Sequence, residues 1–162
     1  MFFWFIGTAV ITVGLVFRDP RFDYRLLIVG SVLPVGEGLV AGARVLHSLV
    51  FSVALLAVLM VVTSGRKPIR KMLLGLPIGV ILHLVFDGAW NNTEVFWWPF
   101  FGWSFDDASF PVSDRGLWSL LLEAIGIGLC VWLWRHNHLS DADRRRAFLH
   151  DGQLDAVPER FG

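Results

Sequence analysis

Two residues of types that commonly bind metals, His83 and Asp87, lie four positions apart in the apolar run ILHLVFDGAW (81–90). In a helix this spacing puts both side chains on one face, in successive turns. An imidazole nitrogen and a carboxylate oxygen on that face can bind one divalent metal ion, with Zn²⁺ as first choice and Mn²⁺ or Mg²⁺ as alternatives. A hydrogen-bonded packing pair has the same spacing, but ionisable groups in apolar segments are costly and usually functional.

Three further ionisable residues, His47, Glu37 and Glu123, lie near corresponding ends of other apolar segments. At about 1.5 Å per helical residue, they fall with the His–Asp pair within roughly 10 Å of the same boundary. Each residue alone has a structural explanation, but their common depth predicts one polar cavity whose imidazoles and carboxylates bind a divalent metal. Glu37 and Glu123 are candidates for further ligands or a general base, and Arg44 is a candidate for holding a phosphate or carboxylate oxygen.

The composition indicates which kind of protein positions these residues. Of the 162 residues, 55% are hydrophobic and 17% are charged. The mean hydropathy is +0.60, and long blocks lack charge altogether, which is typical of an integral membrane protein. The single cysteine, Cys130, excludes an internal disulfide and a thiolate-based metal site. We see no pattern that predicts nucleic-acid binding, so no such partner is expected.

Several apolar segments are long enough to cross a bilayer, and they predict an all-α integral membrane bundle of about five transmembrane helices. Their ranges are 1–17, 26–44, 45–63, 72–90 and 117–134. Because the second segment contains Pro34 and Gly36, we expect it to be kinked, with a re-entrant hairpin as the alternative. The transmembrane domain then covers 1–135, and 136–162 form a charged cytoplasmic tail with a short helix around 141–150.

Basic residues are distributed unevenly among the predicted loops. All of the 14 lysines and arginines except Arg44 and Arg115 lie in 18–25, in 66–71 or after residue 134. With about five spans these regions share one side of the membrane, which the positive-inside rule makes the cytoplasmic side. We therefore predict a multi-pass protein of a bacterial-type plasma (inner) membrane. Its N-terminus is outside, its C-terminus is cytoplasmic, and its polar cavity lies near the outer face.

The predicted outer loop, 91–116, combines tryptophan and phenylalanine rings with acidic residues. Rings at this density are typical of a segment at the lipid interface, either as an anchoring belt or as a lid that contacts the acyl part of a lipid. Asp106 and Asp107 follow the rings directly and are candidates to reach the cavity. Membrane lipids are therefore expected partners.

Four short motifs follow one another between about residues 26 and 105. They are GSVLP at 30–34, HS at 47–48, the His-to-Asp spacing in PIGVILHLVFDGAW, and the run FWWPFFGWSF. This series resembles the YdjM-like family of predicted membrane-bound metal-dependent hydrolases. The resemblance implies that His47, His83 and Asp87 are metal ligands.

The chain departs from the family pattern after Leu-Pro, where the family has an aspartate and this chain has Val35, with Glu37 as the expected substitute. Of a His-Arg pair that the family has before His-Ser, the chain keeps only Arg44. The resemblance and the cavity together predict hydrolysis of an ester or phosphoester, in a lipid or a lipid-linked substrate. The metal activates water for the attack, and Arg44 helps to stabilise the developing charge.

Two other functions are compatible with polar stripes on apolar helices. The first is a non-enzymatic membrane scaffold or accessory subunit that packs through these stripes against a partner protein or a second copy. The second is a cation or proton transporter, which ranks last because transporters usually place charges near the midplane and often contain repeats.

Overall fold

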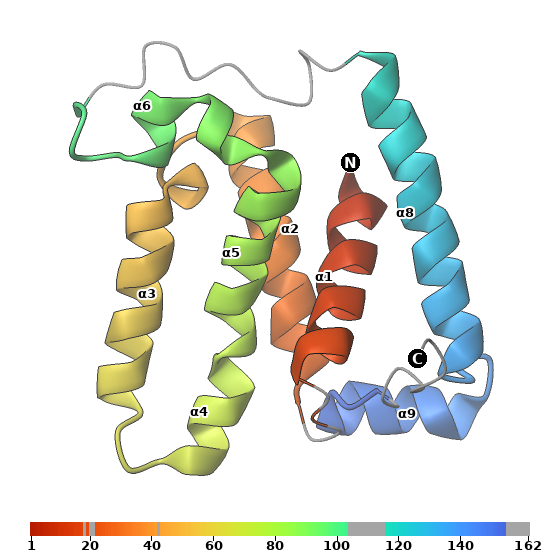
Figure 1. Ribbon diagram of the computed structural model, residues 1–162. Helices are drawn as coiled ribbons and strands as arrows, with labels where there is room; N and C mark the ends of the chain where they lie inside the picture. The colour runs from red at the N-terminus through yellow and green to blue at the C-terminus, as the bar shows by residue number, and fades with distance from the viewer. Residues whose placement is uncertain (18, 20–21, 42, 104–115, 155–162) are drawn as a thin grey trace.

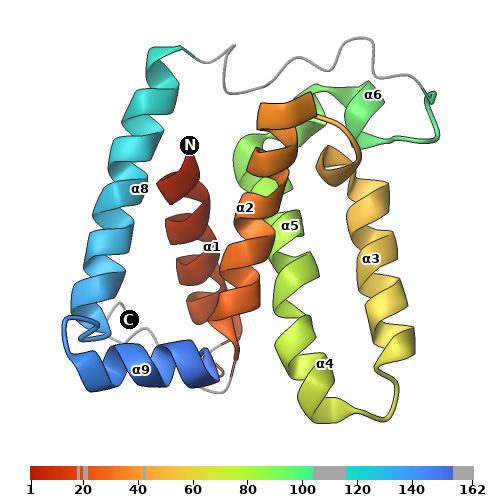
Figure 2. The ribbon, with the colours of Figure 1, turned by 180° about the vertical axis from the view of Figure 1, so that it is seen from behind.

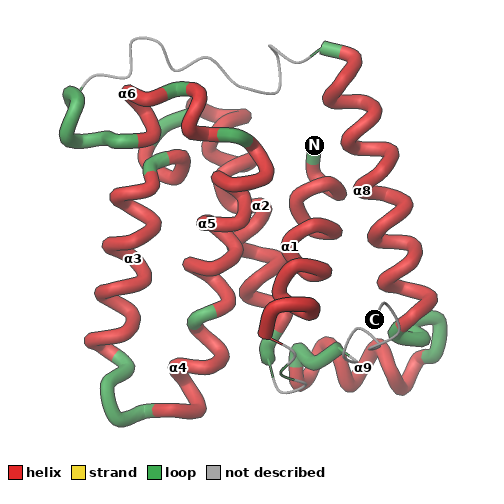
Figure 3. The backbone as a smooth tube through the Cα atoms, in the orientation of Figure 1, coloured by secondary structure: helices red, strands yellow, loops and turns green. Residues whose placement is uncertain are grey.

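The computed structural model describes all residues except 18, 20–21, 42, 104–115 and 155–162. Within this part of the chain every regular element is a helix, which confirms the predicted all-α class (Figure 3). The elements are α1 (Phe2–Phe17), α2 (Tyr24–Ala41), η1 (Val45–His47), α3 (Leu49–Val62), α4 (Lys67–Leu73), α5 (Gly75–Asp87), η2 (Ala89–Asn91), α6 (Thr93–Phe96), α8 (Leu117–His136) and α9 (Ala142–Asp151).

The long helices α1, α2, α3, α5 and α8 run roughly alongside one another, and α9 lies across one end of them (Figure 1). The most extensive packing joins α2 to α5, while α3 packs on another side of α5 (Figure 2). Helix α1 lies between this group and α8. The bundle core includes Ala9, Val10, Val13, Tyr24, Leu27 and Leu133, which are all buried.

Two helices in the described part of the chain are long and apolar enough to cross a membrane. They are Lys67–Asp87, which joins α4 and α5 over 21 residues, and Leu117–His136, which has 20 residues. Helices α1 and α3 are apolar but shorter, with 16 and 14 residues. A helix needs roughly 20 apolar residues to cross the hydrocarbon core when it stands upright, so α1 and α3 do not meet this length by themselves.

The surface of the bundle carries many large apolar side chains. Exposed examples on α8 are Leu117, Trp118, Leu120, Leu121 and Val131, and those on α3 are Val53, Val58, Val61 and Val62. In contrast Ser31, Ser48 and Ser52 are completely buried. A soluble protein rarely exposes such broad apolar faces while burying its polar groups. This distribution is the one expected of helices that are surrounded by lipid.

Glycine allows α2 and α5 to approach each other closely. A Cβ atom on Gly30 of α2 would collide with the carbonyl oxygen of Leu76, and one on Gly79 of α5 would collide with the carbonyl oxygen of Leu27. A Cβ atom on Gly75 would lie 2.9 Å from the backbone nitrogen of Leu27. The glycine face of α5 therefore packs directly on the backbone of α2.

Helix α2 runs without interruption through Pro34. The missing N–H of proline costs one bond of the helical ladder but does not end the helix here, and the re-entrant hairpin that the sequence left open is not formed. Of the predicted boundaries, 117–134 matches α8 closely, whereas 45–63 begins too early, as described below. The predicted tail helix around 141–150 is confirmed as α9.

The start of α2 and the basic helices α4 and α9 lie at one end of the bundle (Figure 1). The opposite end holds η1, η2, α6 and the first turn of α8. These basic segments of the sequence are thus gathered at one end of the bundle, away from the end that holds η1, η2 and α6. Which end faces the cytoplasm remains a prediction.

Helix α9 of the charged tail is bound to the start of α2. The guanidinium of Arg25 donates to the carbonyl oxygens of Leu149 and His150, both at 2.8 Å. The same group donates to the carboxylate of Asp23 at 2.6 and 3.0 Å. The backbone N–H of Tyr24 donates to the carbonyl of Gly152 at 2.8 Å. The end of α9 is therefore fixed by one arginine that the sequence pattern did not single out.

We expect acid to release α9 from the bundle. Burial raises the pKa of Asp23, but the hydrogen bonds and charge of Arg25 outweigh burial, and the net pKa is lowered. Because contact with Arg25 lowers the pKa of Asp23, the ionised carboxylate stabilises the contact between α9 and the start of α2. This stabilisation is complete above the ordinary pKa of aspartate, near 4. It is lost as the pH falls through the lowered pKa of Asp23. At neutral pH, Asp23→Asn is expected to increase protease cleavage near α9 about tenfold. Asp143→Asn, on an exposed residue of α9, should leave cleavage unchanged, and equal effects of both substitutions would contradict this expectation.

Candidate metal centre

The structure brings His47, His83 and Asp87 together. Each residue offers one ligand atom, and these atoms all lie within 4.8 Å of one another. His83 and Asp87 lie in successive turns of α5, as the spacing predicts, and His47 comes from η1, before α3. All three side chains are buried, with at most 3% of their surface exposed. Two imidazoles and a carboxylate therefore converge from separate segments in the interior.

Backbone from α2 orients the ring of His83. Its Nδ1 lies 2.8 Å from the carbonyl oxygen of Ser31, and a carbonyl can only accept, so Nδ1 carries the proton. Nε2 is then the atom with a lone pair for a metal. The ring of Phe5 packs against the imidazole, with centroids 3.9 Å apart. His83 is thus held by α2 on one side and α1 on another.

The second imidazole, His47, is oriented by a carboxylate. Its Nδ1 lies 3.2 Å from Oε2 of Glu37. The same carboxylate accepts backbone N–H groups of Arg44 at 3.2 Å and Leu46 at 3.0 Å. Proteins that bind metals commonly fix a ligating histidine by such a carboxylate on its other nitrogen. The rings of His47 and His83 are 5.3 Å apart and nearly perpendicular, at 83°.

His47 reaches this position because the helix that follows it begins late. The sequence pattern predicted a helix from residue 45 with His47 on its polar face, and this part of the prediction is wrong. Residues 45–47 form a 3-10 turn, and Ser48 then caps α3 by accepting the backbone N–H of Phe51. Serine is a favoured N-cap because its oxygen satisfies an N–H that the helix leaves open. In this turn the imidazole of His47 points toward Glu37.

The hydroxyl of Ser48 also connects the site to a distant segment. It donates to the carbonyl oxygen of Trp98 at 2.7 Å. The His-Ser and Trp-Pro motifs are therefore in contact, although 50 residues separate them. Since Ser31 belongs to the GSVLP motif and contacts His83, all four motifs of the sequence series meet at this centre.

Glu123 lies elsewhere. Its carboxylate accepts the backbone N–H groups of Phe2 at 3.0 Å, Phe3 at 3.2 Å and Trp4 at 3.4 Å. An acidic side chain there stabilises the start of α1, since the first turn of a helix has open N–H groups and a partial positive charge. Glu123 is at the predicted end of the bundle, but it is not grouped with His47, His83 and Asp87.

The remaining candidates lie at the edge of the site or outside the described residues. Arg44 is exposed, and its backbone N–H contacts Glu37. Asp106 and Asp107 fall within 104–115, outside the described residues, as does most of the proposed lid. Reasoning from the sequence missed Ser31 and Phe5, because a carbonyl group and a phenyl ring have no spacing that marks them as part of a site.

The donor set fits a transition metal. Two imidazole nitrogens and one carboxylate oxygen occur at catalytic zinc sites, where a further position is left for water or substrate. Both imidazoles have Nδ1 bonded to an acceptor, so both present Nε2 as the ligand. Mg²⁺ prefers oxygen ligands and fits less well. Of the metals expected from the sequence, Zn²⁺ is the one whose preferred ligands match this donor set.

Comparisons of the chain with protein-family models, with curated proteins and with solved structures found no match. The case for this site therefore rests on its own geometry.

Removing the charge of Glu37 is expected to weaken metal binding. Glu37→Gln keeps an acceptor for His47 but loses the negative charge, so we expect the metal affinity to fall about 10- to 100-fold. Competition with a chromophoric chelator measures this affinity. Glu94→Gln, on an exposed acid of α6, is the control. An unchanged affinity in Glu37→Gln would show that Glu37 does not act on the metal ligands.

Proposed function

We propose that this protein is a membrane-bound metal-dependent hydrolase that cleaves an ester or phosphoester, in a lipid or a lipid-linked substrate. The observation that carries the proposal is the convergence of His47, His83 and Asp87 in a buried cluster, with both imidazoles oriented through Nδ1. Three protein ligands leave room for water and substrate, which distinguishes a catalytic site from a closed structural one.

Different residues of the chain would orient the ligands, exclude water and bind the substrate at such a site. A divalent metal bound there supplies a Lewis acid and makes water available as a nucleophile near neutral pH. Glu37 and the carbonyl of Ser31 keep the imidazoles in the ligating tautomer. Phe5 covers one face of His83 and excludes water from it. Arg44, exposed beside Glu37, is our candidate for binding the anionic group of the substrate.

An apolar groove between α1 and α2 supports a lipid substrate. It has a volume of about 450 Å³ and is lined by α1 and α2, including Phe2, Ile6, Val32 and Leu39. Phe2 and Ile6 flank Phe5 in sequence, and Phe5 is the residue that packs on His83. Helix α1 therefore contributes both a wall of this groove and the ring that packs on a proposed ligand.

The membrane arrangement that we propose follows the sequence pattern. Helices α1, α2, α3, α4–α5 and α8 form about five spans, with the cluster near the outer face and α9 in the cytoplasm. The location is a bacterial-type inner membrane. Exposed apolar faces on α3 and α8 support the embedding.

The test is hydrolysis by the full chain in lipid nanodiscs, supplied with Zn²⁺ or Mn²⁺. The probes are a glycerolipid carboxylic ester, a phosphatidic acid and a lipid-linked diphosphate. Wild type should release product from one of these classes, and His47→Ala should reduce the rate to the uncatalysed background. Glu94→Gln should keep the wild-type rate. Metal-loaded wild type without activity on any ester or phosphoester lipid would overturn the proposal.

One observation favours the alternative of a non-enzymatic scaffold. Gly36 of α2 and Gly128 of α8 are exposed, and an added Cβ atom would meet nothing within 4 Å. Small residues on open faces of apolar helices allow a partner helix to approach closely. A scaffold predicts that Gly36→Leu or Gly128→Leu breaks up a stable complex in the membrane, while the protein binds no stoichiometric metal.

A further inference from the structure

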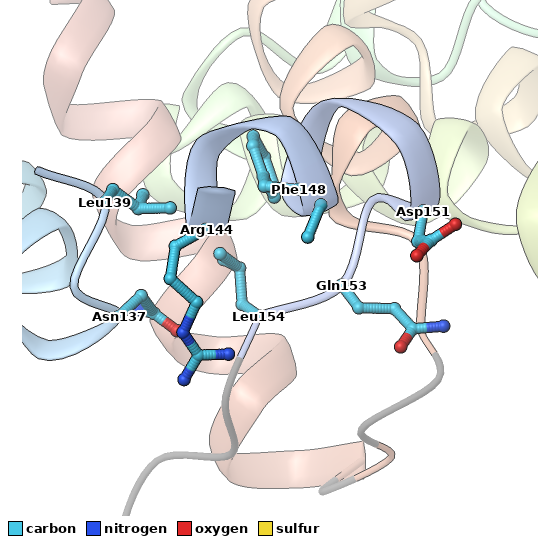
Figure 4. A pocket seen from close by; sticks show the side chains of 8 residues that line it. Asn137, Leu139, Arg144, Phe148, Asp151, Gln153 and Leu154 are labelled. Atoms are coloured by element: carbon cyan, nitrogen blue, oxygen red, sulfur yellow. The ribbon is translucent and has the colours of Figure 1, made fainter. Parts of the chain in front are cut away.

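A second cavity lined by charged and polar side chains lies at the opposite end of the bundle from the metal centre, where α8 is connected to α9. A surface cavity of about 490 Å³ is lined there by Arg135, His138, Ser140, Asp141 and Arg144. An adjoining pocket of about 190 Å³ lies between α9 and 153–154 and shares Arg144, whose side chain extends along it in Figure 4. Neither cavity is part of the proposed metal centre.

Side-chain hydrogen bonds to backbone carbonyls hold the turn that carries this cavity. The guanidinium of Arg145 donates to the carbonyl oxygens of Leu139 at 3.1 Å and Ser140 at 2.7 Å. The side-chain amide of Asn137 donates to the carbonyl of Leu133 at 2.9 Å. His138 is held in the left-handed region, at φ 52°. A residue other than glycine rarely adopts this conformation, and such strain concentrates at functional sites.

The chemistry of the lining is that of an anion site. Arg135 and Arg144 supply guanidinium donors, which match the oxygens of a phosphate. The oxygen of Ser140 accepts the indole N–H of Trp134 at 3.1 Å, so its own proton is directed to another acceptor. Among the described residues that line the larger cavity, Asp141 is the one acid. It is the N-cap of α9 and accepts the backbone N–H of Asp143 at 2.9 Å.

The surroundings favour the phosphate of a lipid over one free in water. Trp132 and Trp134 are partly exposed on the last turns of α8, just before the cavity. Tryptophan is enriched at the level of lipid headgroups, at the ends of transmembrane helices. Basic pockets at the cytoplasmic ends of such helices attract anionic headgroups. The cavity is thus placed where a headgroup phosphate lies if α8 crosses the membrane.

We propose that the cavity between α8 and α9 binds a phosphate group, supplied by an anionic phospholipid, through Arg135, Arg144, His138 and Ser140. This site is independent of the metal centre and of hydrolysis. It anchors α9 against the membrane surface.

The test measures binding to the delipidated full chain in detergent, by its thermal shift and by native mass spectrometry. The probes are phosphatidylglycerol, phosphatidylcholine with the same acyl chains, and inorganic phosphate. Phosphatidylglycerol should bind and raise Tm, and phosphatidylcholine should do so much less. The affinity for phosphatidylglycerol should fall about tenfold or more in the double variant Arg135→Gln/Arg144→Gln.

The matched control is Arg146→Gln, which removes the same charge from an exposed position of α9 that pairs with Asp143. It should keep the wild-type affinity. Equal loss in the control and the double variant would mean that only overall charge matters, and this would overturn the site. If inorganic phosphate competes fully with the lipid, the phosphate site stands and its source is a free anion. No binding of either probe would refute it.

His138→Gly separates a binding role from a structural one. Glycine adopts φ near 52° without strain, so the lipid-free variant should be more stable than wild type. It also removes the imidazole, so its affinity for phosphatidylglycerol should fall. A more stable protein with unchanged lipid affinity would remove His138 from the site.

Discussion

Replacing His83 or Asp87 with alanine is expected to abolish metal binding while leaving the bundle assembled. The wild-type chain, purified in detergent and supplied with Zn²⁺ or Mn²⁺, should contain about one ion per chain by elemental analysis. Each of the two residues supplies one ligand atom of the cluster of three. Loss of one ligand leaves two, which do not hold an ion through purification.

The bundle should survive because the two side chains are not its main contacts. The packing of α5 rests on its glycine face against α2 and on buried Val80 and Leu84. His150→Ala is the matched control for the histidine, since this side chain is 87% exposed on α9. It should keep the full metal content. Circular dichroism and gel filtration check the fold of each variant.

A folded wild-type protein that takes up neither Zn²⁺ nor Mn²⁺ would end the hydrolase proposal. The cluster would then be a hydrogen-bonded packing group, and the scaffold hypothesis would take precedence. Metal that stays bound in both alanine variants would place the ion elsewhere in the chain.

The second large effect is expected from Gly30→Ala. One added methyl group would collide with the backbone of Leu76, whose carbonyl carbon would lie 3.0 Å from it. Backbone cannot rotate away as a flexible side chain can, so α2 and α5 must separate. We expect a loss of stability of about 3 kcal/mol or more, at the upper end for overpacking. Thermal unfolding in detergent measures it as a lower Tm.

The same helix provides the control. Gly36→Ala adds the same methyl group six residues later, where nothing lies within 4 Å. Alanine is the better helix former, so this variant should be unchanged or slightly more stable. Similar unfolding temperatures for the two variants would mean that α2 and α5 do not pack as closely as described.

Gly30→Ala should also weaken metal binding, although Gly30 offers no ligand. His83 is oriented by the carbonyl of Ser31, the residue that follows Gly30, across a distance of 2.8 Å. If the helices separate, this hydrogen bond is lost and the imidazole can turn. A destabilised variant that keeps full metal affinity would show that the orientation of His83 does not depend on α2.

The sequence by itself determined the helical class, most of the segments and the relation between His83 and Asp87. These features depend on local periodicity: residues four apart share a face of a helix whatever surrounds it. By the same rule Gly75 and Gly79, also four apart, lie on one face of α5, which packs closely on α2. The uneven distribution of basic residues likewise predicted that 66–71 and the tail share one end.

Only the tertiary structure decided what surrounds those residues. It put His47 on a 3-10 turn beside Glu37, Glu123 at the start of α1, and α9 on Arg25. Each of these contacts joins segments that are distant in the sequence or depends on where a helix begins. Periodicity gives the face of a helix, but not which other segment meets that face. Which segments meet depends on how side chains of given volumes pack and on where the connecting turns end. The start of α3 after Ser48, which leaves His47 on a 3-10 turn, is one example.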